Sequence, residues 1–133
     1  MSGQREVIES ISTELASVSL AEDRIIEIRF IHEYEVQPTH IATLQKAMRT
    51  LGDGNILQKV LVVPGRYGGI SKEARDRDMF DFPNRPVDFS VAIVSTQLHQ
   101  RLLGSMYFKL NPKKYRFKFF KSEEEARNWL LND

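Results

Sequence analysis

The sequence predicts an α/β domain with a mixed sheet, and two observations carry that prediction. Short apolar segments with the alternation of β-strands follow one another along the chain, separated by longer segments whose apolar residues recur at helical spacing. Two of the short segments, Val60–Val63 and Val91–Val94, are continuously apolar and rich in β-branched residues, which is typical of strands buried in a parallel sheet. The elements are expected in the order β-β-α-β-α-β-α-β-α, with an opening hairpin and a parallel centre.

The chain is expected to begin with a frayed polar segment, residues 1–12, and to continue as a single domain over residues 13–133. The first strand of that domain is predicted at 13–20, with a helix as the alternative. The second strand, Arg24–Ile31, alternates apolar and charged residues as a half-buried strand does. Because only a short polar turn at 21–23 separates the two strands, they are expected to form a hairpin.

Four later segments have the apolar periodicity and the end signals of helices. The first begins at Pro38 or Thr39, since proline is well suited to a first helical turn and threonine can cap one. A short charged helix is expected over 72–80, and a longer helix over 97–110. The last helix begins after Ser122, where Ser-Glu-Glu-Glu has the form of a capping box.

The last strand is predicted at 115–119, where aromatic and basic residues alternate. Basic residues among aromatic ones can bind single-stranded nucleic acid by stacking. Alternatively, the aromatic residues point into the core and the basic ones keep an exposed edge strand from pairing with another chain. The second interpretation is favoured, so no nucleic-acid partner is expected. The basic residues in question are Lys113, Lys114, Arg116, Lys118 and Lys121.

Composition excludes several classes of protein. The 19 Lys and Arg residues against 18 Asp and Glu residues leave a net charge of +1, so the strong basic excess of many duplex-binding domains is missing. The chain contains no cysteine, which excludes a disulfide framework and a thiolate nucleophile. Its apolar runs are far shorter than the roughly 20 residues of a membrane span, and no signal-peptide pattern opens it. A cytoplasmic protein without integral membrane association is expected.

Sequence motifs of catalysis and cofactor binding are also missing. The three histidines, His32, His40 and His99, have neither the spacing nor the accompanying glutamate of a zinc helix, so they are interpreted as ordinary surface histidines. Neither a nucleophile elbow nor a phosphate-binding glycine fingerprint is present. We therefore expect no catalytic residue, no metal, no cofactor and no enzymatic activity.

Three stretches carry a resemblance to a known family: Ile70–Arg75, then Val91–Ser95 running into Gln100–Phe108, and Phe119–Ala126 with Trp129 and Leu130. They resemble STAS domains of the anti-sigma-factor-antagonist type, and more closely the small bacterial STAS-like (SpoIIAA-like) proteins. The resemblance spans residues 13–131 and implies a non-enzymatic regulatory or protein-interaction module with a protein partner. Since a related fold binds lipids, a small carrier or sensor of an apolar ligand is the alternative function.

The resemblance draws attention to Ser71, because the antagonists carry a phosphorylated serine at the start of the helix after their third strand. Here Gly69 and Ile70 precede the serine, where those proteins have an aspartate. Ser71 is therefore expected first of all to cap its helix. Together with Gly68, Gly69 and Lys72 it is also a candidate phosphoacceptor or anion site at a helix start, with a plain flexible turn over 65–69 as the alternative.

A second candidate site is a surplus of large apolar residues in and after the short helix. They are interpreted as core packing, with a ligand pocket or an interaction surface as the alternative. The expected interaction surface lies on the helices at 72–80 and 97–110, and a weak homodimer through it is predicted. The residues are Met79, Phe80, Phe82 and Tyr107.

Overall fold

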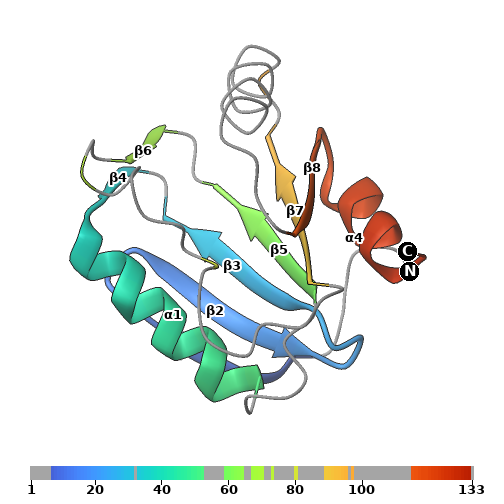
Figure 1. Cartoon of the computed structure of the whole chain (residues 1–133), viewed down its shortest axis with the longest axis horizontal. Coiled ribbons are helices and arrows are strands. Elements are labelled where there is room, and N and C mark those ends of the chain that lie inside the picture. Colours follow the sequence, from blue (N-terminus) through green and yellow to red (C-terminus); the bar gives the residue numbers. More distant parts are fainter. Residues whose placement is uncertain are drawn as a thin grey trace.

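The computed structural model describes residues 7–31, 33–52, 59–64, 67–70, 73, 80, 89–95, 97 and 115–132. In these ranges strands and two helices follow one another along the chain (Figure 1). Their bounds are β1 (Val7–Ser12), β2 (Ala16–Ala21), β3 (Ile26–Phe30), β4 (Glu33–Val36), α1 (Pro38–Gly52), β5 (Lys59–Val63), β6 (Tyr67–Ile70), β7 (Ser90–Val94), β8 (Arg116–Phe120) and α4 (Glu123–Leu131).

The main sheet has six strands in the order β1-β2-β3-β5-β7-β8 (Figure 1). The first three strands pair antiparallel, and the pairs β3–β5, β5–β7 and β7–β8 are parallel. The predicted mixed sheet with an opening hairpin and a parallel centre is confirmed. The predicted last strand is also confirmed, as β8 at one edge of the sheet.

The beginning of the chain differs from the prediction, because residues 7–12 form β1 instead of a frayed segment. A tight turn joins β1 to β2: the Thr13 N–H donates to the Ala16 carbonyl at 2.8 Å, and the Ala16 N–H donates to Thr13 Oγ1 at 3.1 Å. The alternative of a helix at 13–20 is wrong, since Ala16–Ala21 is the strand β2. Val7–Ser12 was missed because its apolar residues do not alternate strictly, and only its pairing with β2 makes it a strand.

A second difference is a small two-stranded sheet formed by β4 and β6. The sequence predicted a polar connector at 32–37 and a turn at 65–69, yet Tyr34 lies opposite Gly68 and Glu35 opposite Gly69 in a parallel ladder. Glu33–Val36 alternates charged and apolar residues, but over only four positions, and Tyr67–Ile70 contains two glycines. Pairing between these two segments, which are remote in sequence, therefore stabilises both strands where the local signal is weak.

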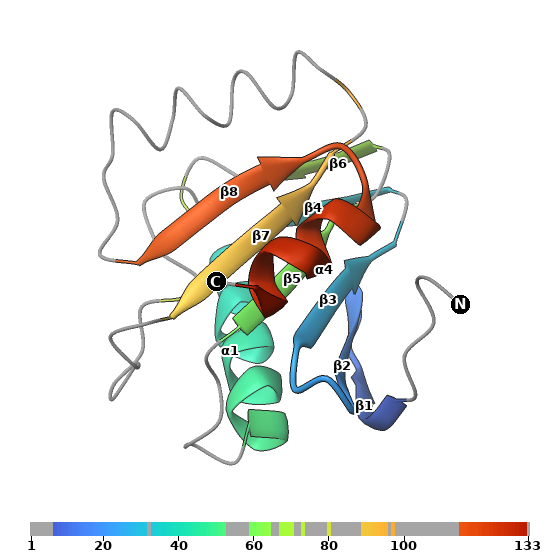
Figure 2. The same ribbon diagram turned by 90° about the vertical axis from the view of Figure 1, so that its right-hand side faces the viewer.

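The two helices lie on opposite faces of the sheet (Figure 2). Helix α1 packs on the antiparallel strands and α4 on the parallel ones. Consecutive side chains of β5 belong to different layers of the core. Val60 lies in the cluster under α1 and Leu61 in the cluster under α4, and both are fully buried. This confirms the prediction that β5 is buried on both faces. The helices predicted at 72–80 and 97–110 lie almost entirely outside the described residues.

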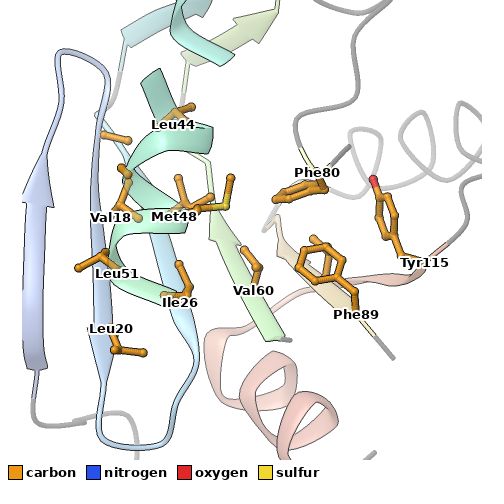
Figure 3. Packing of buried hydrophobic residues seen from close by; sticks show 14 residues of the cluster. Val18, Leu20, Ile26, Leu44, Met48, Leu51, Val60, Phe80, Phe89 and Tyr115 are labelled. Atoms are coloured by element: carbon orange, nitrogen blue, oxygen red, sulfur yellow. The ribbon is translucent and has the colours of Figure 1, made fainter. Parts of the chain in front are cut away.

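The core under α1 has an aliphatic part and an aromatic part (Figure 3). The aliphatic part joins Leu44 and Met48 of α1 to β2, β3 and β5. The aromatic part consists of Phe80, Phe89 and Tyr115, whose ring centroids lie 5.6–5.8 Å apart in tilted or edge-to-face pairs. Such pairs add about 0.5–1.5 kcal/mol each beyond the burial of their area. The core under α4 comprises Ile25, Leu61, Ala92, Val94, Ala126 and Leu130.

Among the described residues, no helix is both long and apolar enough to cross a membrane.

Candidate interaction surface

The strand β8 combines exposed basic side chains with half-buried aromatic ones. Arg116 and Lys118 are exposed, whereas Phe117, Phe119 and Phe120 are half-buried. Alternation accounts for residues 116–119, because successive side chains of a strand point to opposite faces. Phe120 lies on the same face as Arg116 and Lys118 and packs against the core under α4. Since β8 ends the sheet, its basic residues lie at an edge, as the sequence predicted. We call Arg116, Lys118, Phe119, Phe120, Lys121 and Glu125 the β8 surface.

Aromatic rings hold two of these cations in place. The guanidinium of Arg116 lies 5.3 Å from the centroid of the Trp129 ring, and the Lys118 ammonium lies 5.5 Å from the centroid of Phe120. The rings of Phe120 and Trp129 contact each other at 5.6 Å. Each cation–π contact at an exposed site contributes about 0.5–1 kcal/mol. The contacts restrict the motion of both long side chains.

An open pocket lies beside these cations, with a volume of about 420 Å³. Both polar and apolar side chains line it, so it can accept an apolar group next to a charged one. The lining residues are Lys118, Phe119, Phe120, Lys121 and Glu125.

The beginning of α4 is defined by a serine cap. The Glu125 N–H donates to Ser122 Oγ at 3.2 Å, as the predicted capping box requires of its serine. Three glutamates occupy the first turn, where negative side chains stabilise a helix through its dipole. One of them, Glu125, reaches the pocket, so the pocket has a single acidic side chain beside its two lysines.

A buried arginine attaches α4 to the opening hairpin. Arg127 is 6% exposed and donates to Asp23 Oδ2 at 2.6 Å and to Glu27 Oε1 at 2.8 Å. Asp23 also accepts from the Ile25 N–H at 3.2 Å, which holds its carboxylate in the turn between β2 and β3. Both carboxylates are themselves largely buried, at 9% and 17% exposure of their side chains. The guanidinium therefore fixes the position of α4, and with it one wall of the pocket.

The network extends to the surface through Arg29. Its guanidinium donates to Glu123 Oε1 at 2.6 Å and to Glu27 Oε2 at 3.1 Å. The hydrogen bond to Glu123 raises the pKa of Arg29 above its ordinary value; burial opposes this, and the bond and charge of Glu27 reinforce it. Arg29 thus stays charged, and links the first turn of α4 to β3.

The predicted anion site is only partly within the described residues. Gly68 and Gly69 lie in the extended strand β6, so the turn expected there is wrong for these two residues. Ser71 and Lys72 lie outside the described residues, and their role as a helix cap or an anion site stays a prediction.

Of the four apolar candidates, Phe80 is a core residue. It is 7% exposed and lies against two other aromatic residues of the core (Figure 3). Phe80 therefore packs in the core, which is the role that the sequence analysis favoured for it. Met79, Phe82 and Tyr107 lie outside the described residues, so the interaction surface predicted on the helices around them stays a prediction.

Of the histidines, His40 lies within the described residues and has a local structural contact. Its Nδ1 accepts from the Gln37 N–H at 2.9 Å, just before α1. Its Nε2 lies 3.7 Å from a carboxylate oxygen of Glu14. Over the described ranges, no group of three or more histidine or acidic side chains has the arrangement of a metal site.

Sequence reasoning missed the Arg127 network. Arg127 and Asp23 lie 104 residues apart, and charged residues in a helix and a turn are ordinary surface features by pattern. One signal pointed in this direction: Arg127 directly follows Ala126 and belongs to the apolar side of α4, where a charged residue needs a buried partner.

Comparisons with known proteins agree with this architecture. A crystal structure of an uncharacterised protein of the DUF3478 family with a SpoIIAA-like fold, from Shewanella loihica PV-4, matches with a TM-score of 0.55 at 16% sequence identity and covers 98% of each chain. At this identity the likeness shows the fold, and it confirms the predicted STAS-like, SpoIIAA-like architecture. No curated protein matches the chain.

A family model described as a domain of unknown function (DUF7793) matches residues 19–132, which runs from the middle of β2 to the end of α4. Because this match includes most of the sheet and both helices, the chain belongs to the DUF7793 family of domains of unknown function, with a SpoIIAA-like fold.

Proposed function

We propose that the chain is a non-enzymatic protein-interaction module whose β8 surface binds an acidic segment of a partner protein. One observation carries the proposal: the exposed cations of Arg116, Lys118 and Lys121 lie at the edge of the sheet beside an open pocket with aromatic walls. A regulatory role in a bacterial cytoplasm, expected from the resemblance to anti-sigma-factor antagonists, is the setting in which such a module would act.

The rigidity of the surface supports binding. β8 pairs with β7 along its whole length, and α4 is held by the buried Arg127. The Lys118 ammonium already rests on an aromatic ring. A preformed surface loses little conformational entropy on binding, so more of the contact energy contributes to affinity.

The chemistry of the surface favours a carboxylate-rich peptide with an apolar side chain. Carboxylates form charge-assisted hydrogen bonds with lysine and arginine, and an apolar side chain fits the aromatic walls of the pocket. Glu125 at the rim would repel a uniform polyanion there, which favours isolated acidic residues on either side of an apolar one.

The packing of Phe80 supports the interaction module over a carrier of an apolar ligand. Phe80, which was a candidate for lining a ligand pocket, packs instead against Phe89 and Tyr115 in the core. The pocket at the β8 surface is open and flanked by charges, which suits a peptide better than a lipid.

The test is a selection from a displayed peptide library, followed by affinity measurement by fluorescence polarisation. We expect selected peptides to be rich in Asp and Glu around an apolar residue, and to bind more weakly as salt rises because exposed charges are screened. The double variant Lys118→Glu/Lys121→Glu should lower the affinity at least tenfold. The matched control, Lys46→Glu/Arg49→Glu, reverses the same number of exposed charges on α1 and should bind like the wild type.

Selected peptides without acidic enrichment would contradict the proposal, and so would equal binding by the two double variants. Chemical-shift perturbations of the bound protein, measured by NMR, should centre on Lys118–Lys121 and Glu125.

A further inference from the structure

We propose that the open edge of β1 is a self-association site, where a second copy of this chain pairs antiparallel with β1 and continues the sheet into the partner subunit. In the part of the chain that the structure describes, β1 is the end strand of the six-stranded sheet, opposite β8, and it is the outermost strand at the left of Figure 3. The site shares no residue with the β8 surface. A result that contradicts this inference therefore leaves the proposed function unaffected, and the reverse also holds.

The backbone of β1 presents hydrogen-bonding groups at this edge. In an antiparallel pair, hydrogen-bonded residue pairs alternate with non-hydrogen-bonded ones. The Thr13 N–H bonds to the Ala16 carbonyl, so Ile11, two residues earlier, also exchanges its bonds with β2. The N–H and C=O groups of Ser10 and Ser12 therefore point away from β2, toward the open edge.

The side chains of β1 lack the features that block strand pairing. Edge strands are usually protected from pairing with another strand by lysine and other charged residues, or by proline. β1 has one charged residue, Glu9, and its large apolar residues Val7 and Ile8 are 53% and 57% exposed. The ladder between β1 and β2 shifts register between Val7 and Glu9. That irregularity limits regular pairing to Glu9–Ser12, so the association should be weak and depend on concentration.

An apolar row across the sheet sets the register. Ile11 lies opposite Val18, Val18 opposite Ile28, and Ile28 opposite Val62, all on the face that α1 covers. The row ends at Ile11, which is half-buried. With Ile11 on the two-fold axis opposite the partner's Ile11, the row continues into the second copy.

This register also satisfies the backbone and avoids like charges. Ser10 lies opposite the partner's Ser12, and each pair exchanges two hydrogen bonds through the outward groups. Glu9 lies opposite the partner's Thr13. A register shifted to place Glu9 opposite the partner's Glu9 would juxtapose two carboxylates, which is destabilising. Because each copy contributes the same strand, the contact closes on itself as a dimer.

Sedimentation velocity over a concentration series tests the dimer. The wild-type mass should rise with concentration from 15.4 kDa toward twice that value. Ser10→Lys/Ser12→Lys places like charges opposite each other at both serine pairs and should keep the chain monomeric. The matched variant Ser10→Lys/Ser12→Glu changes the same exposed positions, but it places opposite charges across the interface and should dimerise at lower concentration than the wild type.

A cysteine pair tests the register, since the chain has no cysteine of its own. Ile11→Cys should form an intermolecular disulfide on mild oxidation, because non-hydrogen-bonded residues in this geometry have Cα atoms about 4.5 Å apart. Glu9→Cys should not, because the two cysteines would be about 14 Å apart along the strands.

A wild type that stays strictly monomeric at high concentration would overturn the inference. Equal dimerisation of the two double variants would also overturn it, since the interface would then lie elsewhere. Crosslinking of Glu9→Cys but not of Ile11→Cys would overturn the register.

Discussion

The two edges of the six-stranded sheet have opposite chemistry. β1 exposes Val7 and Ile8 and has no basic residue, whereas β8 exposes Arg116 and Lys118 and is followed by Lys121. An edge strand with lysines resists pairing with another strand, and an apolar edge invites it. The two proposals above use this difference. In them a partner peptide contacts the side chains of the basic edge, and a second copy of the chain pairs with the backbone of the apolar edge.

The edges also differ in how they are attached. β1 is joined to β2 through a tight turn, so its position depends on local contacts. β8 is remote in sequence from most of the sheet, and α4 follows it directly and is held by Arg127 against Asp23 and Glu27. The β8 side therefore depends on long-range contacts, and variants there should affect stability most.

The largest effect should come from Arg127→Ala. It removes the guanidinium that bonds two largely buried carboxylates, and breaking a buried ion pair costs about 3–5 kcal/mol. The free energy of unfolding from urea denaturation measures the loss. Arg29→Ala is the control, because its side chain is 44% exposed and the loss should be within about 1 kcal/mol. Equal losses for the two variants would show that Arg127 does not fix α4.

A smaller effect is expected from Ser122→Ala, which removes the cap of α4. The Glu125 N–H loses its acceptor, and the expected loss is about 0.5–2 kcal/mol of unfolding free energy. Ser122→Asn retains a capping oxygen and should melt close to the wild type. If Ser122→Ala and Ser122→Asn melt at the same temperature, the cap contributes nothing to the stability of α4.

The smallest expected effect is a change in self-association through the edge strands. It tests whether the side chains of an edge strand decide whether that strand pairs with another chain. Lys118→Ile removes an exposed cation from β8 and makes this edge resemble β1. We expect a new, weak self-association, visible as a concentration-dependent mass in light scattering, on the background of Ser10→Lys/Ser12→Lys. A strictly monomeric triple variant would mean that something other than charge protects β8.

Much of the fold could be predicted from the sequence, because its elements carry their own periodicity. The continuous apolar runs at β5 and β7 indicated strands buried on both faces, and the helical spacing before Gly52 indicated α1. Of the strands that were missed, β1 and β6 have no such pattern, and β4 alternates charged and apolar residues over only four positions. Each of these strands is stabilised by pairing with a neighbouring strand. The local sequence pattern contains no information about that pairing.

The candidate surface could be predicted only in part. The alternation in Arg116–Phe120 correctly indicated a basic edge strand, since that property belongs to one strand. The pocket and the cation–π contacts require α4 to lie beside β8, and the position of α4 is set by Arg127 and two carboxylates of the hairpin. Charged residues so far apart in the sequence give no signal of their contact.

The distance along the chain between Arg127 and Asp23 has a consequence for the order of folding. The hairpins of β1, β2 and β3 need only local contacts, so they can form within microseconds once their residues are available. The Asp23 carboxylate, however, must wait for a guanidinium 104 residues later. During synthesis the growing chain would hold an incomplete sheet, lacking β8 and α4, until residues 116–131 have left the ribosome. Completion of the fold is then a late event, in which β8, α4 and the ion pairs of Arg127 with Asp23 and Glu27 form together.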